Sequence, residues 1–114
     1  MRPEVAKLLC DARAAGVAID TFTSGKDFPA YAADAMLRSA VERQFEIIGE
    51  ALGRAVRIDP GLEAKIPEIH RIVGLRNRLI HGYDSVDDEL MWDLLQTKLR
   101  ALTQLLDAVL VGFD

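Results

Sequence analysis

The 114-residue sequence predicts an all-α protein, an antiparallel bundle of four to five helices that forms a single domain over residues 1–114. Three observations predict this fold. Apolar residues recur three and four positions apart along most of the chain, as they do on the buried face of a helix. No segment alternates apolar and polar residues over the length of a strand. Proline, glycine and aspartate gather in short clusters that separate the helical stretches.

The first predicted helix begins at Pro3, since a residue in the first helical turn needs no backbone N–H. Its apolar repeat continues to Ile19. Turn-forming residues fill positions 20–27 and predict that the helix ends there. A short helical piece is expected at residues 29–33, ahead of the second long helix.

The second predicted helix is capped by Asp34, whose carboxylate can accept hydrogen bonds from the free N–H groups of the first turn. Its apolar stripe runs from Leu37 to Val56. The helix is therefore expected to span about 23 residues. Gly49 and Gly53 lie one turn apart in its interior, where glycine is unfavourable. We expect another element to pack closely against them.

The third predicted helix follows a break at residues 59–61 and runs to Ile80. Pro67 is expected in its first turn, and Gly82 at its C-terminal cap. Ser85 with Asp88 resembles a capping box for a final helix of about 25 residues. That helix is expected to pack along the second one through a seam spaced four and three apart, formed by Met91, Leu95, Lys98, Leu102, Leu105 and Val109.

The distribution of charge along the sequence indicates which kinds of ligand the protein can bind. A net charge of −4 argues against a protein that coats nucleic acid through bulk electrostatics. Residues 65–83 nevertheless carry a local net charge of +3, and residues 84–114 carry −5. We therefore expect an anionic substrate at the first of these stretches.

Several features predict a cytoplasmic protein with no membrane contact. The apolar runs are shorter than the roughly 20 residues that span a bilayer. Lys7 and Asp11 interrupt the N-terminal apolar stretch, which argues against a secretory signal there. Cys10 is the one cysteine, and we interpret it as a small core residue. Two histidines without cysteine or glutamate partners at ligand spacing argue against a metal site, and no cofactor is expected.

The residues able to act on a phosphodiester lie close together near the end of the third helix. His81 is the one with an ordinary pKa suited to proton transfer near neutrality. Arg76 offers a permanently charged planar fork that matches phosphate oxygens. Asn77 can orient the imidazole or the phosphate, and Arg78 adds a supporting cation. Tyr83 can stack on a base or bond to a phosphate.

Alternatives remain at this point. Arg76 and His81 are five residues apart, about 140° around a helix, so they do not share a face. Either the helix frays near its end, or a twofold dimer brings two copies of the motif into one cleft, which we favour. An arginine and a histidine at a helix C-terminus also suit simple capping. His70 is expected to be solvated, and Glu42, Glu46 and Glu50 to form a wet helical face flanked by Arg38 and Arg54.

A family resemblance adds to this interpretation. The run from Arg76 to Tyr83, Arg-Asn-Arg-Leu-Ile-His-Gly-Tyr, resembles the Arg-x4-His-x-Tyr signature of the HepT-like toxins in the HEPN superfamily. Residues 22–28 resemble the first loop of that family, residues 42–51 its second helix and residues 74–77 its motif entry. At residues 67–71 the chain departs from the Ile-Pro-Trp element that many members carry, which leaves the local cleft wall in question.

The resemblance implies a homodimeric, metal-independent endoribonuclease that cleaves RNA by 2′-hydroxyl attack. It implies that Arg76 and His81 are catalytic and that Asn77 and Arg78 support them. It also implies a type VII-like toxin–antitoxin pair, in which a minimal nucleotidyltransferase antitoxin adenylylates Tyr83. The rival hypothesis from another class is a non-catalytic, nucleotide-binding or adaptor subunit of a nucleotidyltransferase complex.

Overall fold

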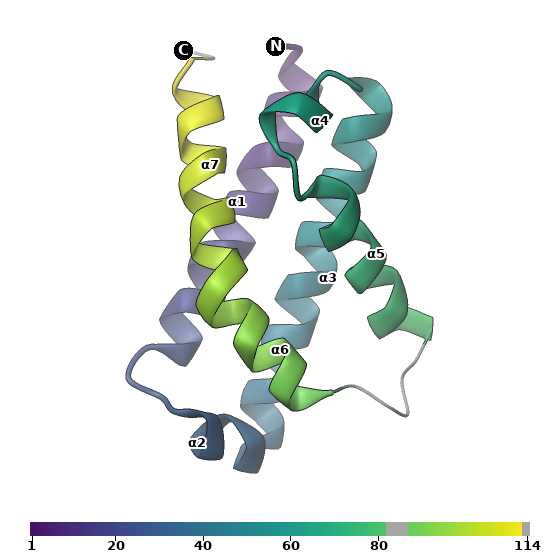
Figure 1. Cartoon of the computed structure of the whole chain (residues 1–114). Helices are drawn as coiled ribbons and strands as arrows, with labels where there is room; N and C mark the ends of the chain where they lie inside the picture. The colour runs from purple at the N-terminus through teal and green to yellow at the C-terminus, as the bar shows by residue number, and fades with distance from the viewer. Residues whose placement is uncertain (82–86, 113–114) are drawn as a thin grey trace.

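The computed structural model describes residues 1–81 and 87–112, and for residues 79–81 the backbone only. Within these ranges it contains helices and no strand (Figure 1). No helix in this part of the chain is long and apolar enough to cross a membrane. The elements are α1 (Pro3–Thr23), α2 (Phe28–Ala33), α3 (Ala35–Ile58), α4 (Leu62–Lys65), α5 (Ile69–His81), α6 (Asp88–Leu94), a π-helical segment η1 (Leu95–Leu99) and α7 (Arg100–Val111).

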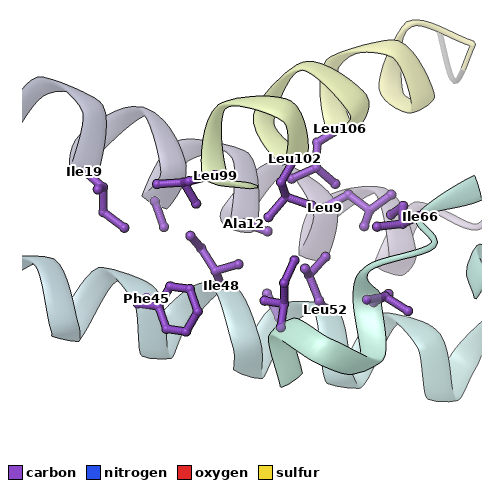
Figure 2. Packing of buried hydrophobic residues seen from close by; sticks show 14 of the residues in the cluster. Leu9, Ala12, Ile19, Phe45, Ile48, Leu52, Ile66, Leu99, Leu102 and Leu106 are labelled. Carbon is purple, nitrogen blue, oxygen red and sulfur yellow. The ribbon is translucent and has the colours of Figure 1, made fainter. Parts of the chain in front are cut away.

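The long helices pack antiparallel around one core, as the sequence predicts. Figure 1 shows α1 descending, α3 returning beside it, and α5 and α7 flanking this pair. The core forms where α1 and α3 face each other and α7 closes over α1 (Figure 2). Its members include Leu9, Ile19, Phe45, Ile48, Leu52, Ile66, Leu99, Leu102 and Leu106. The predicted all-α bundle is therefore confirmed.

Helix α1 ends at Thr23, four residues later than the turn-forming cluster predicts. The hydroxyl of Thr21 donates to the carbonyl of Val17 (3.0 Å), and that of Thr23 to the carbonyl of Ile19 (2.8 Å). These bonds let threonine continue the helix. The chain reverses only at Gly25, whose φ of 73° lies in the left-handed region that favours glycine.

Helix α2 confirms the predicted short helical piece, and α3 confirms the predicted long helix and its cap. The Asp34 carboxylate accepts from the backbone N–H of Leu37 at 3.0 Å. The break at residues 59–61 is also present, but it leads into the unpredicted short helix α4, which buries Leu62. Pro67 precedes the first residue of α5 by two positions, so its predicted place in the first turn is wrong. Gly82 lies outside the described residues.

The start of the final helix differs from the predicted capping box. Asp87 is the N-cap of α6, and its carboxylate accepts from the N–H of Leu90 at 3.1 Å. Ser85 lies outside the described residues. Asp88, the expected second member of the box, begins the helix and lies near Arg38. A single aspartate therefore caps this helix in place of the predicted pair.

The final helical run has the predicted length, but its expected packing partner is wrong. It packs mainly against α1, while its first segment α6 contacts α2. Its expected seam is confirmed at Met91, Leu95 and Leu102, which are buried, and is wrong at Lys98. Lys98 is exposed, and Leu99 is buried instead. Leu106 and Leu110 are buried, and the predicted Leu105 and Val109 pack partly buried against the core beside them.

Candidate active site

Arg76 lies where α5 crosses α3, and its side-chain stem rests on Gly49. A Cβ at Gly49 would overlap Cβ and Cγ of Arg76 and lie 3.2 Å from its Cδ. One turn later, a Cβ at Gly53 would lie 3.6 and 3.7 Å from the methyl groups of Val73. The predicted close packing is confirmed at Gly49, whereas the neighbour of Gly53 lies at ordinary contact distance. The absence of a side chain at Gly49 is what brings the arginine onto α3.

Two polar groups hold the Arg76 guanidinium. Nη2 donates to Oε2 of Glu50 at 2.8 Å, and Nη1 donates to Oδ1 of Asn77 at 2.9 Å. The buried Nε has no acceptor among the described residues. The side chain is 26% exposed, so the end of the guanidinium still reaches solvent. An anion approaching this end would meet N–H donors whose position is already fixed.

An open groove of about 590 Å³ lies beside Arg76, between α1 and α3. Its floor is apolar. Its charged lining balances three arginines against three acids, namely Arg43, Arg54, Arg76, Asp11, Glu46 and Glu50. Arg43 pairs with Glu46 at 3.3 Å, and Arg76 pairs with Glu50 at 2.8 Å. Arg54 makes no ion pair with the side chains of residues 1–78 and 87–112, so it adds one cation to the groove without a partner in that part of the chain.

The other predicted site residues have different outcomes. Asn77 is exposed and contacts Arg76, and its predicted role in orienting the imidazole or the phosphate stays a prediction. Arg78 is exposed. His81 is the last residue of α5, and only its backbone is described. Tyr83 lies outside the described residues. The pairing of Arg76 with His81 in one cleft therefore stays a prediction.

Glu50 is the site residue that the sequence reasoning missed. The prediction of a solvated helical face holds for Glu50, which is exposed, but is wrong for Glu42 and Glu46, which are partly buried. Glu50 is exposed but contacts Arg76, Glu46 is partly buried beside Arg43, and Glu42 is partly buried. The sequence did contain an indication that Glu50 lies near another element, because Gly49 immediately precedes it. A glycine inside a helix indicates a close neighbour, and the next residue lies at the edge of that contact.

A second polar cluster joins α2, α3 and α6. Tyr31 is fully buried and its ring lies 5.2 Å from that of Trp92, tilted by 38°. Arg38 lies 3.7 Å from the carboxylate of Asp88 and donates to the carbonyl of Ala32. Burial, followed by the negative charge of Asp88, raises the pKa of Glu42 above its usual range. Burial also raises the pKa of the Tyr31 hydroxyl, which has no hydrogen-bond partner among the described residues.

The histidine and cysteine residues outside the motif do not form a catalytic or metal site among the described residues. His70 is exposed, as expected, and lies 2.8 Å from Glu63. Cys10 packs partly buried against the core, in agreement with its predicted role. Among the described side chains, no group of three or more histidine, cysteine, aspartate or glutamate residues is placed to hold a metal ion.

Comparisons with known proteins point to one family. A family model described as "Ribonuclease HepT-like" matches residues 14–109. "Putative RNase MJ1380" of Methanocaldococcus jannaschii is 39% identical over 77 residues, which cover 66% of this chain and 68% of that protein. "Putative RNase TTE0752" of Caldanaerobacter subterraneus subsp. tengcongensis is 29% identical over 86 residues, which cover 75% and 76%. No solved structure matches the chain with significant similarity.

Proposed function

We propose that this chain, which belongs to the HepT-like ribonuclease family, is a metal-independent endoribonuclease with Arg76 and His81 as catalytic residues. The family match spans both residues. The observation that carries the proposal is the placement of Arg76, whose guanidinium is held by Glu50 and Asn77 at the edge of an open groove. A fixed, partly exposed arginine suits the stabilisation of a phosphorane.

In the proposed reaction, His81 removes the proton of an RNA 2′-hydroxyl, and the resulting oxygen attacks the adjacent phosphorus. The bond from phosphorus to the 5′-oxygen breaks, and that oxygen takes up a proton. The products are a 2′,3′-cyclic phosphate and a 5′-hydroxyl. Arg76 stabilises the negative charge that accumulates on the phosphorane, and Arg78 contacts a neighbouring phosphate. In a homodimer, Arg76 of one copy would act with His81 of the other, and that His81 would return the proton it removed to the leaving 5′-oxygen.

RNA cleavage in the presence of EDTA tests this proposal. We expect chelator-resistant cleavage that leaves cyclic phosphate ends. His81→Ala and Arg76→Ala should each lower the rate by about 100-fold or more. His70→Ala is the matched control, because His70 is exposed, pairs with Glu63 and does not line the groove beside Arg76. Undiminished cleavage by His81→Ala would refute the assignment, and wild-type protein that binds a nucleotidyltransferase without cutting RNA would support the adaptor hypothesis.

We further propose that a cognate minimal nucleotidyltransferase antitoxin controls the enzyme by adenylylating Tyr83. The phenol oxygen would bond to the α-phosphorus of ATP, and pyrophosphate would leave. Tyr83 follows His81 by two residues. A phosphate and a nucleoside added there would block access to the imidazole and compete for Arg76. The chain would then be the toxin of a toxin–antitoxin pair.

Intact-mass measurement after incubation with the nucleotidyltransferase and ATP tests the modification. The mass should rise in adenylyl units, and RNA cleavage should fall in parallel. Tyr83→Phe should take up no label. Tyr31→Phe is the control, since Tyr31 is the other tyrosine of the chain and is fully buried. Equal labelling of Tyr83→Phe and wild type would place the modification elsewhere.

A further inference from the structure

We propose that Glu50 is a positioning residue that fixes the guanidinium of Arg76 relative to α3. The inference rests on the proposed function in one respect, because the phosphodiester that Arg76 would meet is the RNA substrate. The contact itself joins two helices. Oε2 of Glu50 on α3 accepts from Nη2 of Arg76 on α5 at 2.8 Å, across 26 positions of sequence.

The other attachments of Arg76 do not tie its guanidinium to α3. Gly49 provides room for the stem and contacts only its aliphatic carbons. Asn77 is the next residue of α5, so its bond to Nη1 fixes the guanidinium only within its own helix. Glu50 is the described group that ties the guanidinium to the helix lining the groove. Removing it would release the arginine from the position where an incoming phosphate would meet it.

Because both side chains are partly exposed, we expect this ion pair to orient the arginine more than it stabilises the fold. The side chains of Arg76 and Glu50 are 26% and 50% exposed. Ion pairs at such positions add little to stability, because water and salt screen them. The carboxylate occupies a single N–H of Nη2, which leaves further donors on Nη1 and Nη2 for phosphate oxygens. Glu50 can therefore hold Arg76 while the substrate binds it.

The first test observes the guanidinium directly and needs no RNA. In protein labelled with 15N-arginine, the Arg76 side-chain signals are identified by their loss in Arg76→Lys. We expect restricted rotation of the Arg76 Nη groups in wild type, free rotation in Glu50→Ala and restricted rotation again in Glu50→Gln, whose amide oxygen still accepts. Unchanged Arg76 signals in Glu50→Ala would overturn the inference, whether or not the protein cleaves RNA.

The second test separates positioning from folding. Glu50→Ala should lower kcat for RNA cleavage by about 10- to 100-fold, as expected for a displaced catalytic group, with KM and Tm nearly unchanged. Glu50→Gln should recover most of the rate. Glu63→Ala is the matched control, since Glu63 makes a contact of the same 2.8 Å with His70 at a similar exposure of 55%. A wild-type kcat in Glu50→Ala, or a loss of rate explained by a lower Tm, would refute the inference, whereas absence of cleavage by wild type would instead refute the proposed function.

Discussion

Arg76 shows how strongly the candidate site depends on single residues. Its stem lies on α3 because Gly49 has no side chain, and its guanidinium is held by one bond to Glu50 and one to Asn77. Gly53, a turn later, has more space around it, because Val73 lies at ordinary contact distance. Two glycines one turn apart on the same helix therefore have different physical roles, and substitution can separate them.

Alanine at the two glycines should have opposite effects. Gly49→Ala places a methyl group inside the Arg76 stem, so we expect a loss of about 1–3 kcal/mol in the free energy of unfolding and a loss of RNA cleavage. Gly53→Ala meets no clash and gains helix propensity, so stability should rise by up to about 1 kcal/mol. Urea unfolding measures both. Equal shifts in the same direction would contradict the assigned contact.

Tyr31 gives a second prediction at the residue scale. Its buried hydroxyl has no hydrogen-bond partner among the described residues. Tyr31→Phe removes that hydroxyl and keeps the ring against Trp92. We expect the free energy of unfolding to rise by about 1 kcal/mol, because an unpaired buried polar group is costly. A clear loss of stability in denaturant titration would show that the hydroxyl is hydrogen-bonded in solution.

At the scale of elements, α3 connects the two polar regions of the molecule. Its later half carries Gly49 and Glu50 beside α5, and its earlier half carries Arg38 and Glu42 beside α6. Asp88 begins α6 and lies near Arg38. The start of the final helix is therefore tied to the same helix that holds the candidate catalytic arginine. The charge of Glu42 opposes this arrangement, because it is partly buried near a second carboxylate.

Stability should depend on pH through Glu42. Burial and Asp88 raise its pKa in the folded state, so above that pKa the folded protein carries an unfavourable charge. As pH falls, the folded state takes up the proton before the unfolded state does, and this penalty disappears. Glu42→Gln should therefore be more stable than wild type at about pH 7, and the difference should close below about pH 4. Unfolding midpoints across pH measure it. A difference independent of pH would contradict the burial of this carboxyl.

At the scale of the whole molecule, one core leaves an open groove beside Arg76. The core joins α1, α3 and the final helical run, while α5 lies on the outer side of α3 (Figure 1). Arg76 and the end of α5 therefore lie at the periphery of the bundle. A peripheral site is accessible to a second copy of the chain, which is the arrangement that the proposed dimer requires.

Mixing two inactive variants tests whether the site is shared between copies. If one copy supplies Arg76 and the other His81, a mixed dimer of Arg76→Ala and His81→Ala contains one intact site. After denaturation and refolding in equal amounts, activity should recover to about one quarter of wild type, since half of the dimers are mixed and each has one of two sites. Sedimentation should show dimers. No recovery in a confirmed mixed dimer would place both residues in the same copy.

The sequence by itself determined the helical fold, most helix boundaries, the cap at Asp34 and the close packing at Gly49. These follow from apolar spacing, capping chemistry and glycine propensity, which act over a few neighbouring residues. The family motif likewise indicated Arg76 from local sequence.

Only the tertiary structure decided which helices meet and which distant side chains pair. It placed the final helix on α1 and brought Glu50 to Arg76 across 26 positions. Such choices depend on the shapes of whole helix surfaces and on how they fill one core. The spacing of apolar residues along the sequence does not determine which helices meet, because the same apolar stripe can pack against more than one neighbour.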